Sequence, residues 1–159
     1  MKQWFLLGIM VFVTVVTGCS NQVDPLTGIS EVKVAVDRLY IALQKEDMTA
    51  LSALFAHDED LVVFGLQEGE RYVGWEAVHD MFQKQMDMTE GIQTSIADQK
   101  INVSKDGKTS WVSSLNHTTG QVGGEMVEMD YRSTVVLEKR GGKWLIVHIH
   151  MSKPETSES

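Results

Sequence analysis

The spacing of apolar side chains predicts three helices in the N-terminal half of the chain. The first begins near Glu31, and the second begins after Asp47, whose carboxylate suits a helix N-cap. The third follows Gly74. The apolar positions that recur every three or four residues are Val32, Val36, Leu39 and Leu43 in the first helix, Leu51, Leu54 and Phe55 in the second, and Val78, Met81 and Phe82 in the third.

Alternating and continuous apolar runs predict strands in the rest of the chain. Two are short, at residues 61–64 and 71–73. Beyond about residue 92, four longer segments read as strands, at residues 96–104, 109–118, 126–139 and 144–151. Helices followed by consecutive antiparallel strands predict an α+β fold, with the helices covering one face of the sheet.

The last two predicted strands indicate which side chains face the helices. On residues 126–137 the apolar side carries Val135 and Leu137, so we take that side as the inner face. A three-residue Arg-Gly-Gly loop would pair Leu137 with Leu145 and keep the inner face apolar, whereas a two-residue Gly-Gly loop would mix the faces. We therefore expect Leu145, Val147, Ile149 and Met151 inside, and Trp144, Ile146, His148 and His150 outside.

The N-terminus has the features of an export signal. Lys2 precedes an apolar run at residues 4–16, and small residues lead to Cys19, the one cysteine in the chain. The run has 13 residues and would be about 20 Å long as a helix. A helix that crosses a membrane needs roughly 20 residues, so the run is too short. Val-Thr-Gly-Cys resembles a bacterial lipobox, in which the chain is cut before the cysteine and the thiol is lipidated. An ordinary signal peptide and a true membrane span are the alternatives.

These features divide the chain into four parts. We expect a lipoprotein signal peptide at residues 1–18, the lipidated cysteine and a tether at 19–30, one folded domain at 31–152, and a disordered tail at 153–159. The protein would be extracytoplasmic and anchored to a bacterial membrane through Cys19. Ser20 after the cysteine resembles the outer-membrane sorting pattern of organisms with two membranes.

The charge narrows the classes of partner. The formal net charge is −8, and no run of basic residues is present, which argues against nucleic acid and against electrostatic binding to anionic lipid. The expected membrane link is therefore the lipid itself. No pattern in the sequence implies a cofactor or a metal site.

Three segments carry a resemblance to a known family. Residues 47–56, residues 72–78 and residues 143–152 are similar to the SnoaL-like branch of the nuclear transport factor 2-like superfamily, and the last also resembles the association domain of calcium/calmodulin-dependent kinase II. The resemblance covers about residues 30–152. It implies a cone-shaped fold with about three helices on a curved, mainly antiparallel sheet, often dimeric through the sheet. The family includes enzymes and binding domains, so function has to be argued from the site.

The resemblance also shows what is missing. The base of the steroid isomerases would fall at Val63 or Phe64, the acid near Ser133, and the tyrosine at Leu39 with Tyr40 one step away, so their catalytic residues are not retained. We expect instead an apolar cone pocket that binds a small lipophilic ligand. Its predicted lining is Phe64, Trp75, Trp111, Leu115, His117, Met129, Tyr131, Val135, Val147, Ile149 and Met151.

The polar candidates leave two further hypotheses. An isomerase, dehydratase or cyclase acting on a small hydrophobic substrate would use His117 and Tyr131 as its acid/base pair, although a rim histidine without a catalytic role is the alternative. The outer sheet face carries charged and apolar side chains together, which favours a homodimer interface, or a structural partner-binding role. The predicted interface residues are Asp130, Arg132, Trp144, His148 and His150. We read the two histidines as interface residues rather than metal ligands, since no third ligand is evident.

Overall fold

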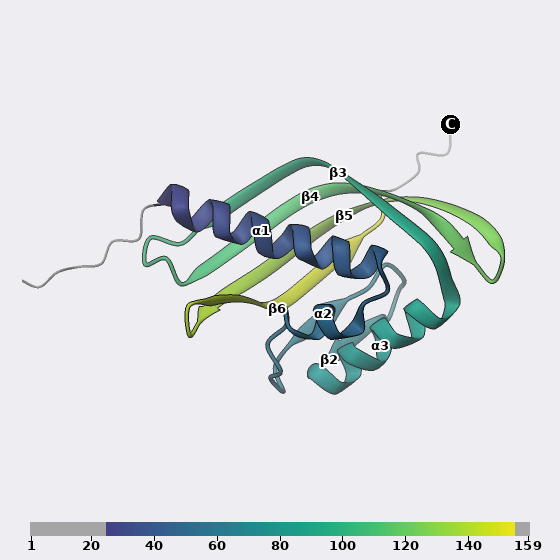
Figure 1. Cartoon of the computed structure of the whole chain (residues 1–159), viewed down its shortest axis with the longest axis horizontal. Helices are drawn as coiled ribbons and strands as arrows, with labels where there is room; N and C mark the ends of the chain where they lie inside the picture. The colour runs from purple at the N-terminus through teal and green to yellow at the C-terminus, as the bar shows by residue number, and fades with distance from the viewer. Residues whose placement is uncertain (1–24, 155–159) are drawn as a thin grey trace, which may run out of the picture.

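The computed structural model describes residues 25–154, so the predicted signal peptide and Cys19 lie outside the described residues. Within that range, no helix has the length and apolar character needed to cross a membrane. Figure 1 shows the longest helix lying across the long strands of one sheet. The elements are α1 (Pro25–Gln44), α2 (Met48–Ser52), β1 (Val62–Phe64), β2 (Arg71–Val73), α3 (Trp75–Met88), β3 (Thr89–Val103), β4 (Thr109–Val122), β5 (Glu125–Arg140) and β6 (Lys143–Ser152).

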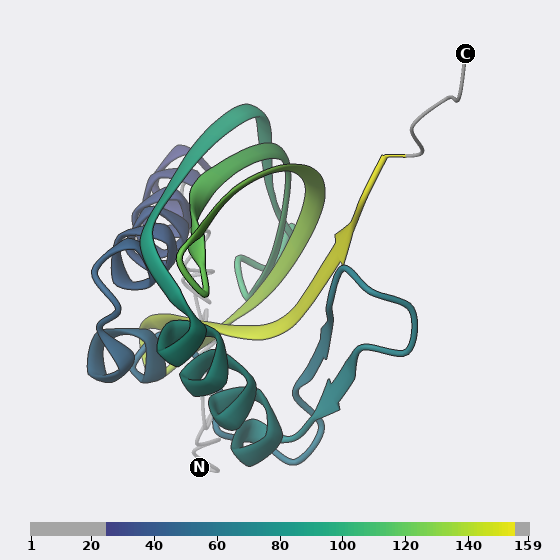
Figure 2. The ribbon, with the colours of Figure 1, turned by 90° about the vertical axis from the view of Figure 1, so that its right-hand side faces the viewer.

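The six strands form one sheet in the order β2-β1-β6-β5-β4-β3. All neighbours are antiparallel except β1 and β6, which are parallel. In Figure 2, β3, β4 and β5 bend together into an arch with α1 at its side. The α+β arrangement predicted from the sequence is therefore confirmed.

Helix α1 buries the face that its apolar spacing predicted. Val32, Val36 and Leu39 are almost completely buried. The helix begins at Pro25 rather than at Glu31, so residues 25–30 of the predicted tether are helical. Proline suits a first helical turn because its missing N–H has no partner there. Gly28 packs closely against Val103 at the end of β3, which places the start of α1 beside the β3–β4 hairpin.

The short helix α2 has the predicted cap. The Asp47 carboxylate accepts a hydrogen bond from the backbone N–H of Ala50 at 2.9 Å. The core lies between the three helices and the facing side of the sheet. Its most deeply buried side chains are Val32, Val36, Leu51, Leu61, Val63, Val78, Val112, Val135, Leu137 and Ile146.

The β5–β6 hairpin has a tighter turn than predicted. Arg140 pairs with Lys143, and the two glycines between them both have positive φ, 56° and 81°. That conformation is typical of two-residue hairpin turns and favours glycine. The predicted three-residue loop is therefore wrong. A two-residue turn was rejected because it would place apolar and polar side chains on the same face of the sheet. A β-bulge in this hairpin avoids that outcome.

The bulge adds one residue to β6. Leu137 pairs with Ile146, whereas Val136 pairs with His148, so Val147 is the extra residue. Before the bulge, the inner side of β6 carries Trp144 and Ile146. After it, the inner side carries Ile149 and Met151, and both histidines lie on the opposite face. The predictions that Trp144 and Ile146 face outward, and Leu145 inward, are wrong.

The prediction of which β4 side chains point toward the helices is also wrong. The side chains turned toward the helices are Ser110, Val112, Ser114 and Asn116, all buried. Trp111 is 46% exposed and Leu115 49% exposed, because they lie on the other face of the sheet. The sequence misleads here because the inner face of β4 is mostly polar. Two of its polar side chains, Ser114 and Asn116, bond to groups on α1 and β5.

Candidate functional site

The candidate site is a hollow on the outer face, which is the side of the sheet that carries Leu115 and His117. Strand register brings six side chains together there in two rows. Neighbouring strands are about 4.8 Å apart, so opposite residues contact one another. The first row is Ser95 on β3, His117 on β4 and Asp130 on β5, and the second is Ala97, Leu115 and Arg132 on the same strands.

The first row contains a histidine–carboxylate pair. His117 Nδ1 lies 2.8 Å from Asp130 Oδ1, and His117 Nε2 lies 3.5 Å from an oxygen of Glu128. A neutral imidazole that donates from Nδ1 to Asp130 carries its lone pair on Nε2. The side chain of His117 is 41% exposed. The pair lies at the edge of the hollow, and its free ring nitrogen, Nε2, is turned toward Glu128.

The second row contains an arginine that holds the end of the chain. Arg132 Nη2 donates to the backbone oxygen of Lys153 at 3.1 Å. Pro154, the next residue, lines the hollow. Among residues 25–154, no carboxylate lies within ion-pair distance of Arg132. Asp130 shares its strand face but is bonded to His117 instead.

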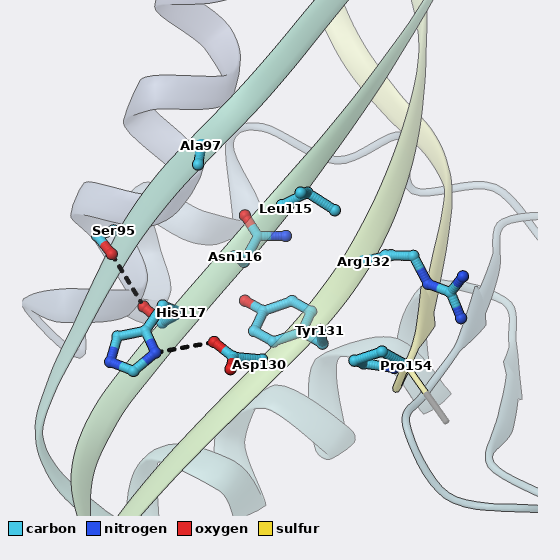
Figure 3. A pocket seen from close by; sticks show the side chains of 9 residues that line it. All are labelled: Ser95, Ala97, Leu115, Asn116, His117, Asp130, Tyr131, Arg132 and Pro154. Atoms are coloured by element: carbon cyan, nitrogen blue, oxygen red, sulfur yellow. Dashed lines mark hydrogen bonds and ion pairs between the residues drawn. The ribbon is translucent and has the colours of Figure 1, made fainter. Parts of the chain in front are cut away.

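The hollow is large enough for a small molecule. Its volume is about 310 Å³, at the lower end of the range for ligand pockets. Figure 3 shows His117 and Asp130 on one side, with Leu115, Arg132 and Pro154 on the other. The lining residues are Ser95, Ala97, Leu115, Asn116, His117, Asp130, Tyr131, Arg132 and Pro154.

The interior, where the resemblance placed an apolar cone pocket, holds a cluster of polar side chains. The Tyr40 hydroxyl donates to Asn116 Oδ1 at 3.0 Å and lies 3.4 Å from Ser133 Oγ. Ser133 also lies 3.0 Å from both Ser114 Oγ and Asn116 Nδ2. All four side chains are buried. These groups satisfy one another, which a buried polar cluster requires.

Tyr131 lies toward this interior cluster rather than toward His117. Burial raises the pKa of Tyr131 above its ordinary value, Tyr40 raises it further, and hydrogen bonding to Thr118 and Thr94 opposes the shift. These three neighbours come from the helix-facing side. The structure thus does not join His117 and Tyr131, the predicted acid/base pair, by a hydrogen bond.

The predicted pocket residues do not gather in one place. Three of them, Leu115, His117 and Tyr131, line the hollow. Val135 and Ile149 are core residues. Phe64 and Trp111 are exposed elsewhere on the outer face. Met129, Val147 and Met151 are half-buried, and none of these seven residues borders the hollow.

Trp75 belongs to a second, more polar hollow of about 400 Å³ at the start of α3. Its indole stacks on His57 with ring centres 4.2 Å apart, is tilted by 36° against the Phe55 ring, and lies at 74° to the His79 ring. Among the described residues, no group of three histidine, cysteine or acidic side chains could hold a metal ion.

The predicted interface residues do not all lie on one surface either. Asp130 and Arg132 line the hollow, while His148 and His150 lie nearby on the outer face of β6. The Phe64 ring meets both imidazoles edge-on, with ring centres 5.8 and 5.6 Å apart. Trp144 cannot take part, because it is 6% exposed and its Nε1 donates to Glu31 of α1 on the helix-facing side of the sheet.

Several site residues were missed from the sequence. Ser95, Ala97 and Pro154 have no distinctive chemistry, and only the strand register places them beside His117. The interior cluster could be predicted in part, because the resemblance placed the family's catalytic positions near Tyr40 and Ser133. Nothing in the sequence indicated that their hydroxyls would lie within hydrogen-bond reach.

Comparison with known proteins agrees with this architecture. The family model described as SnoaL-like domain matches residues 32–156. A solved structure from Streptomyces avermitilis, named as a proposed dehydratase of the NTF2-like family, is 20% identical, with a TM-score of 0.74, and the match covers 84% of this chain and 100% of that one. An NTF2-like protein of unknown function from Pseudomonas putida KT2440 is 23% identical, with a TM-score of 0.71 and coverage of 84% and 91%.

A ketosteroid isomerase-like protein from Erwinia carotovora is 17% identical, with a TM-score of 0.66, and the match covers 80% of this chain and 97% of that one. No curated protein matches this chain in sequence. At these identities the solved structures establish the fold, which is nuclear transport factor 2-like as the sequence predicted. The function has to be argued from the residues of this chain.

Proposed function

This chain belongs to the SnoaL-like domain family, and from that premise we propose that it is a binding protein for a small organic ligand with an apolar body. The ligand occupies the hollow on the outer face. The domain is held outside the cytoplasm by the lipid on Cys19. It acts without catalysis.

One observation carries the proposal. The hollow combines an apolar wall, formed by Ala97, Leu115 and Pro154, with polar groups at two separate points, His117–Asp130 and Arg132. Ligand sites in proteins are usually mainly apolar, with a few placed polar groups that fix orientation. The interior of the cone has fewer polar groups available to a ligand, since its polar side chains are already hydrogen-bonded to one another.

A second candidate function rests on the same histidine. Asp130 orients the His117 imidazole at 2.8 Å, as the partner of a general base does. An acid/base enzyme of the isomerase, dehydratase or cyclase type would use Nε2 to take a proton from its substrate. Binding is favoured, because the second carboxylate near the pair, that of Glu128, belongs to a 73% exposed side chain 3.5 Å from Nε2 and does not line the hollow, and Tyr131 lies toward the interior.

Native mass spectrometry tests the binding function. The full chain, purified from its own host in detergent, should carry a small organic molecule that is released on denaturation. Leu115→Arg should abolish that adduct by filling the hollow with a long charged side chain, whereas Trp111→Arg, on the same strand face but outside the hollow, should retain it. An adduct that survives Leu115→Arg would place the ligand elsewhere.

The His117→Ala variant separates binding from catalysis. As a binding contact, His117 contributes roughly one hydrogen bond, so affinity should fall by about 0.5–1.5 kcal/mol with the fold intact. As a general base, its loss should slow turnover of the co-purified molecule about 10²–10⁴-fold with little change in affinity. Affinity and turnover measured on that molecule would decide between the two.

We also propose that two copies associate through the part of the outer face beside the hollow. Phe64 and Trp111 are 37% and 46% exposed, and His148 and His150 lie close to Phe64. A mixture of aromatic, imidazole and charged side chains is typical of protein interfaces. Closed two-fold symmetry is the commonest arrangement for such self-contacts.

A further inference from the structure

Building on the proposed function, we infer that the ligand of the hollow is a small carboxylic acid whose carboxylate pairs with Arg132, and that His117 keeps Arg132 available for it. The apolar body of the acid lies along Leu115 and Pro154, which line the same hollow. His117 acts on Arg132 indirectly, because it holds the carboxylate of Asp130.

Arg132 is the only arginine or lysine among the described residues that line the hollow. A guanidinium has five N–H donors, and its bond to the backbone oxygen of Lys153 involves Nη2. Among residues 25–154, no carboxylate forms an ion pair with it. A planar guanidinium matches a carboxylate through two parallel hydrogen bonds. Arg132 therefore favours an acid as the ligand.

The same strand contains an arginine at the same spacing that does have an acidic partner. On β5, Arg140 Nη2 lies 2.8 Å from Oε2 of Glu138, two residues before it. Asp130 likewise precedes Arg132 by two residues, and alternate residues of a strand point to the same face. The corresponding ion pair is absent, because Asp130 Oδ1 lies 2.8 Å from His117 Nδ1 instead.

Strand register gives His117 the advantage over Arg132 in this competition. His117 and Asp130 are directly opposite on β4 and β5. Opposite residues are about 4.5–5.5 Å apart, whereas alternate residues of one strand are about 7 Å apart. A carboxylate only accepts hydrogen bonds, so Nδ1 is the donor. Without His117, Asp130 is free to pair with Arg132 and to occupy the group that binds the acid.

The lining of the hollow limits the kind of acid. Its volume is about 310 Å³, at the lower end of the range for ligand pockets. Ala97, Leu115 and Pro154 form its uncharged wall, which suits an apolar body. A second carboxylate on the ligand would lie against this wall or near the negative charge of Asp130. Monocarboxylic acids with a compact apolar body fit these limits, and dicarboxylic acids do not.

Calorimetric titration with two probes tests the inference. Benzoate carries an apolar ring and a carboxylate, and benzamide is its neutral counterpart of similar shape. The full chain is held in nanodiscs, with empty nanodiscs as the blank. We expect benzoate to bind more tightly than benzamide. Arg132→Gln should weaken benzoate about ten- to a hundredfold and leave benzamide unchanged. Arg38→Gln, at an exposed position on α1, is the charge-matched control and should change neither.

Two variants isolate the role of His117. His117→Ala should weaken benzoate about two- to fivefold, because Asp130 then pairs with Arg132. Adding Asp130→Asn removes that competitor and should restore the affinity for benzoate, which the loss of a direct contact between His117 and the ligand would not allow. A double variant that binds benzoate as weakly as His117→Ala alone would overturn the role given to His117.

The comparison of the probes also separates recognition from support. If Arg132 only holds Lys153 and Pro154 in place, Arg132→Gln should weaken both probes equally, which would overturn the inference. Benzamide binding as tightly as benzoate would overturn it too, as would the absence of benzoate binding. The adduct seen by native mass spectrometry judges the proposed function separately. A neutral adduct that Leu115→Arg abolishes would support binding in the hollow and overturn the assignment of an acid.

Discussion

Trp144 donates a hydrogen bond from its indole Nε1 to Oε2 of Glu31 at 3.0 Å, joining β6 to the second turn of α1. The same carboxylate oxygen lies 2.6 Å from Nζ of Lys139 on β5. Glu31 therefore ties the first helix to the β5–β6 hairpin. The bond also explains why Trp144 is an internal residue and not part of a surface.

Replacing Glu31 should destabilise the fold. Glu31→Ala removes the acceptor shared by the Trp144 indole and the Lys139 ammonium, and because the Glu31 side chain is 41% exposed and water can replace part of the lost bonding, we expect a cost of about 0.5–1.5 kcal/mol. Asp37→Ala, which removes an exposed pair with Lys33 on the same helix, should cost only about 0.3–0.5 kcal/mol. Urea unfolding followed by circular dichroism measures both. Equal effects would mean that the Glu31 bond adds nothing beyond a surface ion pair.

The contribution of Glu31 should depend on pH. Its bonds to Lys139 first, and then to Trp144, lower its pKa below the ordinary value of 4.5. A carboxyl group whose pKa is lower in the folded state stabilises the protein fully above the unfolded pKa and loses that effect as the pH falls through the folded pKa. The difference in unfolding free energy between the parent and Glu31→Gln should be constant between about pH 6 and 7 and shrink below about pH 4.5. A difference that grows in acid would contradict this account.

Ser133 should be the most sensitive member of the interior cluster. It lies within hydrogen-bond distance of Tyr40, Ser114 and Asn116, so Ser133→Ala affects three partners at once. We expect a loss of about 1–3 kcal/mol in unfolding free energy. Ser113→Ala, at an exposed position on β4, is the control and should change stability by less than about 0.5 kcal/mol. Thermal unfolding gives the comparison.

Self-association should depend on the outer face and not on Trp144. Phe64→Ala and Trp111→Ala should lower the mass measured by light scattering toward that of one chain, because they remove exposed aromatic contacts. Met126→Ala removes a 71% exposed apolar side chain at the β4–β5 turn and should not change the mass. A parent protein that is already monomeric would dismiss the proposed dimer.

Lipidation should depend on Cys19. In the host, Cys19→Ala should leave a larger, uncleaved precursor and abolish incorporation of labelled fatty acid, since the modified thiol is gone. Gel mobility and radiolabelling measure the two effects. Normal processing and membrane fractionation of the variant would show that the lipobox interpretation is wrong.

The sequence predicted the helices and most strands because their side-chain patterns are strong. The spacing of Val32, Val36 and Leu39 and the cap at Asp47 reappear in the structure as predicted. Strand facing was predicted less well. On β6, one extra residue at Val147 reverses the alternation half-way along the strand, and a rule of strict alternation cannot detect it.

The candidate site was harder to predict because it depends on register between strands. His117 and Asp130 are distant in sequence, and their contact follows only once β4 and β5 are aligned. Trp111 and Leu115 misled the assignment, since large apolar side chains ordinarily mark an inner face. The inner side of β4 can be polar because Tyr40 on α1 donates a hydrogen bond to Asn116. No local sequence pattern connects these two residues.

The packing of Gly28 against Val103 decides which end of the domain would face the membrane under the proposed anchoring through Cys19. The start of α1 lies beside the β3–β4 hairpin, while His117 lies about 25 Å further along β4 at about 3.4 Å per residue. The headgroup layer of a bilayer is only about 5–8 Å deep on each side. With β4 along the membrane normal, the hollow would open well above the headgroups. Its ligand would then be collected from the surrounding water and not extracted from the lipid phase.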